Sequence, residues 1–226
     1  MREAVRLTRV VRLPKQHLAT FGVTRLRYYV VTKPLYQELV PGNDETVVRE
    51  GTVVAERPAM VTPTYMLNLE GFGDEARRYM EGLVRRLGPN SPGLLYQYRN
   101  EPAGMEIVGD EVSAVAQRIA GDLDSRSVDL ASVIQGVDEL WDVSLLKFIY
   151  EYTAASLSSN LGEMKSMGLL EPDPGTELPR GAVTRIEEMF QQVRQGLDPA
   201  VLKAELDRWG LFEQYQDRFF AAVMGR

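Results

Sequence analysis

The sequence contains no cysteine and only one histidine, and these two absences exclude most thiol and imidazole chemistry. Without cysteine there is no disulfide, thiolate nucleophile, iron–sulfur cluster or cysteine-ligated zinc. His17 alone cannot supply the several imidazoles of a di-iron bundle or of most zinc hydrolases. A Ser-His-Asp triad needs only one histidine, but no G-x-S-x-G motif is present to hold the serine. We interpret His17 as a solvated loop residue.

Long apolar runs are missing as well. Arginines are spread through residues 1–13, which therefore lack the apolar stretch of a signal peptide. The most apolar run, Leu145–Tyr150, is interrupted by Lys147, and no segment approaches the roughly 20 apolar residues that cross a bilayer. We expect a soluble, cytoplasmic protein with no membrane partner.

Ordinary globular composition accompanies these absences: 44% of the 226 residues are hydrophobic and 26% are charged. Residues 1–57 are rich in β-branched and aromatic residues, which predicts three or four strands. The predicted strands are 5–13, 26–32, 46–48 and 52–55, with a turn at Pro41–Asp44 and a bulge or tight turn at Gly51.

A helix is expected next, followed by a hairpin and a second helix. Apolar residues recur at helical steps from Phe72 to Leu87. Segments 94–99 and 105–108 flank a five-residue sequence with proline and glycine, which predicts a hairpin loop. Asp110 is predicted to cap the second helix. This order of elements favours an α+β fold with a mostly antiparallel sheet and two helices in the N-terminal part, because a doubly wound sheet requires strict alternation.

Strand signals end near residue 125, and the remaining chain is predicted to be all-helical. We expect a short helix at 128–134, a long helix from Asp138 to about Gly168, and two or three further helices. Small polar residues after Ala155 predict a kink or break in the long helix. The expected organisation is an α+β domain, residues 1–125, and a helical domain, residues 126–226, unless the two parts share one continuous core. The inward residues of the long helix are predicted to be Trp141, Leu145, Phe148, Tyr152 and Ala155.

Positive charge is concentrated in residues 1–33, which hold eight basic residues and one acidic residue in a chain of net charge −6. Beside Tyr28 and Tyr29, such a surface could bind RNA or single-stranded nucleic acid. The alternative is that the basic residues form the solvent face of strands and pair with acids elsewhere. The candidate nucleic-acid-binding residues are Arg6, Arg9, Arg12, Lys15, Arg25 and Arg27.

Two carboxylates form a candidate metal site. Asp138 and Asp142 are four residues apart, so a helix would place them on one side. Such a pair can hold Mg²⁺ together with a substrate phosphate. The alternative is that these acids complement the positive end of a helix dipole.

The leading hypothesis is a non-catalytic interaction or regulatory protein, with a protein partner or self-association through its helical half. Its basis is the absence of a recognisable catalytic arrangement beside abundant apolar helix faces. No cofactor is expected, and the balance is against an enzyme. The alternatives are nucleic-acid binding through the basic segment and a Mg²⁺-dependent enzyme acting on a phosphorylated small molecule.

Overall fold

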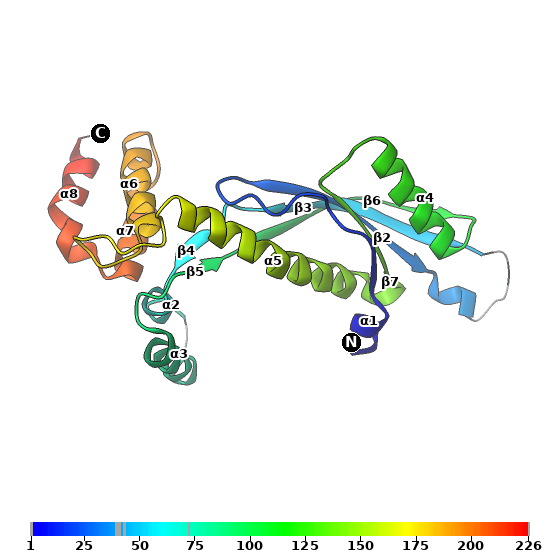
Figure 1. Ribbon diagram of the computed structural model, residues 1–226, viewed down its shortest axis with the longest axis horizontal. Coiled ribbons are helices and arrows are strands. Elements are labelled where there is room, and N and C mark those ends of the chain that lie inside the picture. The colour runs from blue at the N-terminus through cyan, green and yellow to red at the C-terminus, as the bar shows by residue number, and fades with distance from the viewer. Residues whose placement is uncertain (1, 39–41, 43, 72, 226) are drawn as a thin grey trace. The chain divides into compact units, whose positions relative to one another are not determined.

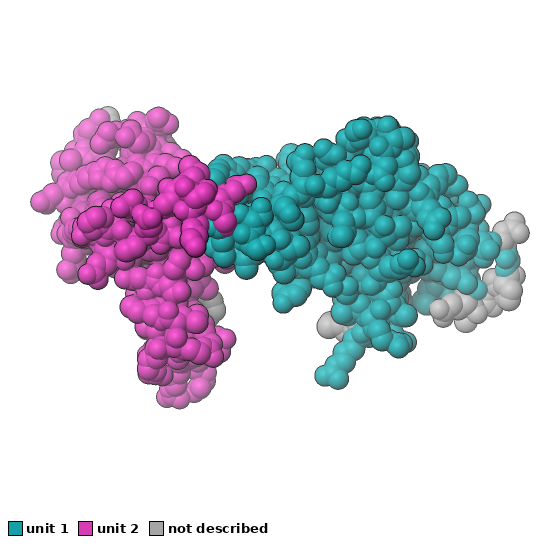
Figure 2. Space-filling view, viewed as in Figure 1, with its two compact units in different colours: residues 1–58, 96–161 teal, residues 59–95, 162–226 magenta. Residues whose placement is uncertain are grey.

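The computed structural model describes residues 2–38, 42, 44–71 and 73–225. Two compact units divide the chain (Figure 1, Figure 2). Unit 1 comprises residues 1–58 and 96–161, and unit 2 comprises residues 59–95 and 162–226. Each unit therefore combines two separate stretches of sequence, and the division expected after residue 125 falls inside unit 1.

Unit 1 contains a five-stranded sheet with the strand order β1-β7-β2-β3-β6. Strand β7 is parallel to β2, whereas the other three neighbouring pairs are antiparallel. The expected α+β fold with a mostly antiparallel sheet is confirmed. The strands are β1 (Arg9–Arg12), β2 (Thr24–Lys33), β3 (Thr46–Ala55), β6 (Tyr98–Val108) and β7 (Ala131–Val137).

Helices α4 and α5 cover opposite faces of this sheet (Figure 1). Successive side chains of β2 alternate between the two faces, as the period of a strand requires. Tyr28 and Val30 therefore pack with Phe148 of α5, while Val31 packs with Val115 of α4. The helical elements of unit 1 are α1 (Arg2–Leu7), η1 (Leu35–Glu38), α4 (Val112–Ser125), η2 (Asp138–Leu140) and α5 (Trp141–Ser166), whose last residues belong to unit 2.

Unit 2 is a small helical cluster that includes a two-stranded antiparallel sheet. Its core contains Tyr65, Phe190, Leu206 and Trp209, all buried. Asp198 begins α7 as the sequence predicts, because its side chain accepts a hydrogen bond from the backbone N–H of Ala200 at 2.9 Å. The elements are β4 (Ala59–Val61), α2 (Pro63–Leu67), α3 (Asp74–Leu87), β5 (Gly93–Leu95), α6 (Arg180–Arg194), α7 (Pro199–Trp209) and α8 (Phe212–Met224).

Two predicted strand assignments are wrong. The segment 5–13 is divided between the end of α1 and strand β1. The predicted hairpin does not form, because β6 runs from Tyr98 to Val108 without a turn and pairs with β3. The bulge expected at Gly51 is confirmed, since the register between β3 and β6 shifts between Glu50 and Gly51. The bulge absorbs the Pro102–Gly104 segment that suggested a loop.

Two helix predictions also need correction. The short helix expected at 128–134 is wrong, because β7 occupies residues 131–137 and adds a central strand to the sheet. The predicted break after Ala155 is absent, and α5 continues to Ser166. Its inward polar residues there have partners: Ser156 accepts a hydrogen bond from the backbone N–H of Leu18 at 3.1 Å. Ser156 also donates to the carbonyl of Tyr152 one turn earlier, at 2.9 Å, and the helix is continuous through both residues.

Some predictions concern residues outside those described, namely Phe72 at the start of the first predicted amphipathic helix and Pro41 and Asn43 of the predicted turn. Among the described residues, no helix combines the length and the apolar character that a membrane crossing requires.

Candidate interaction surface

Helix α5 presents an apolar inner face to the sheet. Leu145, Phe148 and Tyr152 are buried against β2, and Trp141 packs beside them. The Tyr152 hydroxyl donates a hydrogen bond to the carbonyl of Gln16 at 2.5 Å. Burial, followed by the charge of the neighbouring Tyr98, raises the pKa of Tyr152 to about 12. The inner stripe predicted from the sequence is confirmed at these four helix positions, whereas Ala155 is exposed.

The outer face of α5 is apolar too. Leu146 is 64% exposed, Tyr150 is 76% exposed and Leu157 is 37% exposed. With three apolar neighbours they recur at steps of three and four residues, and so lie on one side of the helix. We name this set the α5 stripe. It consists of Val143, Leu146, Tyr150, Ala154, Leu157 and Leu161.

Some polar residues of α5 are buried beside its apolar inner face, which departs from the usual arrangement of a surface helix. Ser144, Ser156 and Asn160 are each at most 1% exposed. The Ser144 hydroxyl lies 2.8 Å from that of Thr8, and the Asn160 amide lies 3.1 Å from the hydroxyl of Tyr96. The helix therefore satisfies polar groups inside while Leu146 and Tyr150 face outward.

One ion pair borders the α5 stripe. The Lys147 ammonium lies 2.7 Å from a carboxylate oxygen of Glu151, one turn further along the helix. The stem of Lys147 is largely covered, with 22% of the side chain exposed. The two opposite charges occupy the same flank of the stripe, on either side of Tyr150 in the sequence.

Asp138 of the candidate metal pair is already bound by protein groups. Its carboxylate accepts hydrogen bonds from Arg49, at 2.7 Å, and from Thr32, at 2.8 Å. Burial on its own would raise the pKa of Asp138, but the bonds from Thr32 and Arg49 and the charge of Arg49 hold that pKa below its ordinary value. The guanidinium of Arg49 also lies over the ring of Trp141, 5.7 Å from its centre. Asp138 thus serves as an anchor between β3 and the start of α5.

Asp142 is exposed at the start of α5, and its carboxylate accepts a hydrogen bond from the backbone N–H of Val143 at 2.8 Å. That contact is the usual use of an acid in a first turn. Within the described residues, no group of three or more histidine, cysteine, aspartate or glutamate side chains is placed to hold a metal ion.

The six basic candidates do not form one free surface. Arg12 is buried, and both it and Lys15 contact the carboxylate of Asp124, at 3.0 and 2.9 Å. Arg25 lies 2.6 Å from Glu101. Arg6 belongs to α1, whereas Arg9 and Arg27 are exposed on β1 and β2.

The two tyrosine rings expected beside the basic residues, Tyr28 and Tyr29, differ in their exposure to solvent. Tyr28 is 1% exposed in the core under α5, where it cannot stack on a base, while Tyr29 on the opposite face is partly exposed. The pairing of strand arginines with acids elsewhere in the chain was the alternative interpretation, and Arg12 and Arg25 show this behaviour.

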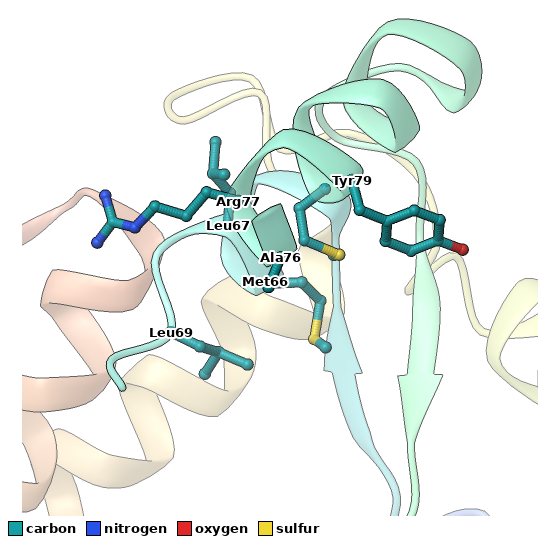
Figure 3. A pocket seen from close by; sticks show the side chains of 7 residues that line it. Met66, Leu67, Leu69, Ala76, Arg77 and Tyr79 are labelled. Carbon is teal, nitrogen blue, oxygen red and sulfur yellow. The ribbon is translucent and has the colours of Figure 1, made fainter. Parts of the chain in front are cut away.

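A separate cavity of about 180 Å³ lies in unit 2 between α2 and α3. Figure 3 shows Met66 and Ala76 lining it, while Tyr79 extends outward. Helix α3 contributes no buried residue, so its apolar side is only partly covered. Most of its lining residues are apolar, and Arg77 and Tyr79 are the polar ones.

The α5 stripe was not among the surfaces predicted from the sequence, where only the inward apolar series of the same helix was identified. A second apolar series with helical spacing was present in the sequence and could have identified it. Comparisons with models of protein families, with characterised proteins and with solved structures gave no match. The proposals below therefore depend on the geometry alone.

Proposed function

We propose that the protein is a non-catalytic interaction protein that self-associates through the α5 stripe, with two copies of α5 packed antiparallel about a two-fold axis. The observation that carries this proposal is the polarity of α5, which buries Ser144 and Asn160 but exposes Leu146 and Tyr150. A surface helix with one apolar face usually directs polar residues to the opposite side, whereas α5 has apolar residues on its outer side as well. Contiguous exposed apolar surface of this kind usually marks an interface.

The stripe fits a second copy of itself. A two-fold axis near Tyr150 brings this residue against its own copy, a self-complementary arrangement that isologous dimers use. Leu146 then lies opposite the small side chain of Ala154, and Val143 lies opposite Leu157. The stripe spans residues 143–161, about 27 Å at the rise of an α-helix, which gives a contact several turns long.

Charge also favours an antiparallel pair. Lys147 and Glu151 lie on one flank of the stripe, and the axis falls between them. The two-fold rotation places Lys147 of each copy beside Glu151 of the other, so the pair produces two complementary contacts. A parallel pair would instead place the charged flanks of the two copies on opposite sides of the interface, where Lys147 and Glu151 could not pair between copies.

Burial of the exposed side chains supplies the driving force. Leu146 and Tyr150 are the most exposed apolar side chains of the stripe. Removing a leucine or similar side chain from water contributes about 1.5–3 kcal/mol. The dimer buries Leu146 and Tyr150 of both copies, four side chains in all. This burial offsets the loss of rotational and translational freedom on association.

Analytical ultracentrifugation of Leu146→Glu tests the proposal. The wild-type protein should sediment as a dimer, and Leu146→Glu as a monomer, because a charge enters the stripe. Leu13→Glu is the matched control, since Leu13 is 62% exposed in the same unit and lies outside the stripe. A wild-type monomer, or a dimer that survives Leu146→Glu, would overturn the proposal.

A charge exchange tests the antiparallel arrangement. Lys147→Glu should weaken the dimer, because it places two pairs of like charges at the axis. Adding Glu151→Lys to that variant should restore it. Equal weakening by the single and the double variant would exclude this geometry.

The alternative functions receive less support. For nucleic-acid binding, two of the residues expected to contribute, Arg12 and Tyr28, are buried. A Mg²⁺-dependent enzyme would need Asp138, whose carboxylate is occupied by Arg49. We propose a cytoplasmic location, which the absence of cysteine supports.

A further inference from the structure

Strand β6 is an edge of the five-stranded sheet. In the part of the chain that the structure describes, β3 is its sole strand neighbour. An edge strand leaves every second pair of backbone N–H and C=O groups unpaired, and proteins usually protect such edges with proline, bulges or charge. At 11 residues, β6 is about twice as long as a typical strand, and its two halves are protected differently.

Only the first part of β6 is protected. Arg99 and Arg25 both bind the carboxylate of Glu101, at 2.9 and 2.6 Å, and so form a charged cover. Pro102 and the register shift next to it then interrupt the edge. Beyond the bulge, the segment Gly104–Val108 pairs regularly with β3 and carries no proline.

This second part is exposed and apolar on one face. Met105 is 65% exposed and Ile107 is 56% exposed, two residues apart and therefore on the same face. A hollow of about 320 Å³ adjoins Met105 on this face, where Tyr28 and Trp141 contribute to its walls. Arg49, whose charge is balanced by Asp138, and Glu50 also line it. We call this the apolar hollow.

The opposite face of the same segment is acidic. A second hollow, of about 240 Å³, is lined by Glu50 and Glu106 together with Tyr29, Val48 and Ile119. Neither carboxylate forms an ion pair or a side-chain hydrogen bond within the described residues, in contrast to Glu101 on the protected part of the strand. We call this the acidic hollow.

We propose that Gly104–Val108 binds an extended basic segment of a partner protein by strand addition. The backbone of the added strand pairs with the free edge of β6, and its side chains alternate between the two faces. One side chain enters the apolar hollow beside Met105, and the next, a lysine or arginine, enters the acidic hollow beside Glu50 and Glu106. The recognised sequence therefore alternates apolar and basic residues.

A second copy of this chain does not fit the same edge. Antiparallel self-pairing of the segment about its centre places Glu106 directly opposite its own copy, and like charges at such a position are destabilising. A basic partner instead meets both free carboxylates with opposite charge. This inference goes beyond the proposed self-association, since the α5 stripe contributes no residue to either hollow.

Binding of synthetic peptides to the full chain tests the proposal by fluorescence anisotropy. The probe is a labelled peptide of alternating valine and lysine, and the comparison peptides replace lysine by glutamate or carry N-methyl groups on alternate backbone nitrogens. The lysine peptide should bind about tenfold or more tightly than either comparison. Equal binding of the N-methylated peptide would overturn strand addition, because that peptide keeps the charge but cannot pair.

Variants of the acidic hollow supply the second arm of the test. Glu50→Gln with Glu106→Gln should weaken binding of the lysine peptide about tenfold. Glu213→Gln with Asp217→Asn removes the same charge from exposed positions of unit 2 and should leave binding unchanged. Equal loss in both double variants would show attraction to net charge alone and would contradict the site. Sedimentation of the same variants separates this result from self-association, which neither double variant should affect.

Discussion

A guanidinium nitrogen of Arg49, in the middle of β3, lies 2.7 Å from a carboxylate oxygen of Asp138, immediately before α5. Thr32 of β2 donates to the same carboxylate oxygen and accepts a hydrogen bond from Arg49 at 3.0 Å. Three segments distant in sequence therefore meet at one charged pair. The ion pair links the segment that precedes α5 to two strands of the sheet.

Asp138→Asn should destabilise the protein at neutral pH by about 1–3 kcal/mol, because Arg49 loses its charged partner. The pKa of Asp138 is lowered in the folded protein. Its contribution is therefore fully present above the ordinary aspartate pKa of about 4 and is lost as the pH falls through the lower folded value. Urea unfolding at neutral and acid pH should show that the difference in free energy of unfolding between wild type and variant narrows below about pH 4. A gap independent of pH would contradict this role.

Gly51→Ala should destabilise unit 1 by about 1–3 kcal/mol through overpacking. A Cβ atom there would lie 2.4 Å from the Tyr28 hydroxyl oxygen and 2.8 Å from the carbonyl oxygen of Glu101. Gly109→Ala is the control, because no atom lies within 4 Å of its added Cβ. Denaturant unfolding measures both, and Tyr28→Phe should recover part of the loss in the Gly51→Ala background.

Arg12→Met should cost about 2–4 kcal/mol, because it leaves buried carbonyls without a donor. The Arg12 guanidinium donates to the carbonyl oxygens of Ala131 and Val128, the latter at 2.6 Å, as well as to Asp124. Arg9→Met, on the exposed side of β1, should change stability by less than about 0.5 kcal/mol. Similar unfolding midpoints for the two variants would show that Arg12 is not a structural residue. Tests of nucleic-acid binding should accordingly vary Arg9 and Arg27 and leave Arg12 in place.

Tyr152→Phe should reduce the loss of stability at alkaline pH. The pKa of Tyr152 is raised to about 12 in the folded protein, above its ordinary value of about 10. The unfolded chain therefore releases its proton first, and the stability that this tyrosine contributes falls between about pH 10 and pH 12. At neutral pH the variant should be about 1 kcal/mol less stable, because it lacks the hydrogen bond to Gln16. Above about pH 10 its free energy of unfolding should decline less steeply than that of the wild type. If the free energy of unfolding fell equally steeply above about pH 10 in both proteins, the raised pKa of Tyr152 would be contradicted.

The sequence by itself determined the fold class and the helices with clear amphipathic spacing. Residues such as Leu145, Phe148 and Tyr152 had to share a face, and the start of α7 followed from Asp198 and Pro199 because both act within one turn. The same local signals failed for β7 and β6. Residues 131–137 become a strand only through pairing with β2 and β1, and the proline and glycine of β6 are accommodated by a bulge against β3.

Only the tertiary structure decided which residues are free to act. Arg12 was one basic residue among several in the sequence, and its burial depends on carbonyls more than 100 residues away. The sequence presented Asp138 as a candidate metal ligand, and only the structure shows that Arg49 binds its carboxylate. The exposure of Leu146 and Tyr150 likewise depends on which side of α5 meets the sheet. Sequence spacing states which side chains share a face, but contacts between distant segments decide whether that face is covered.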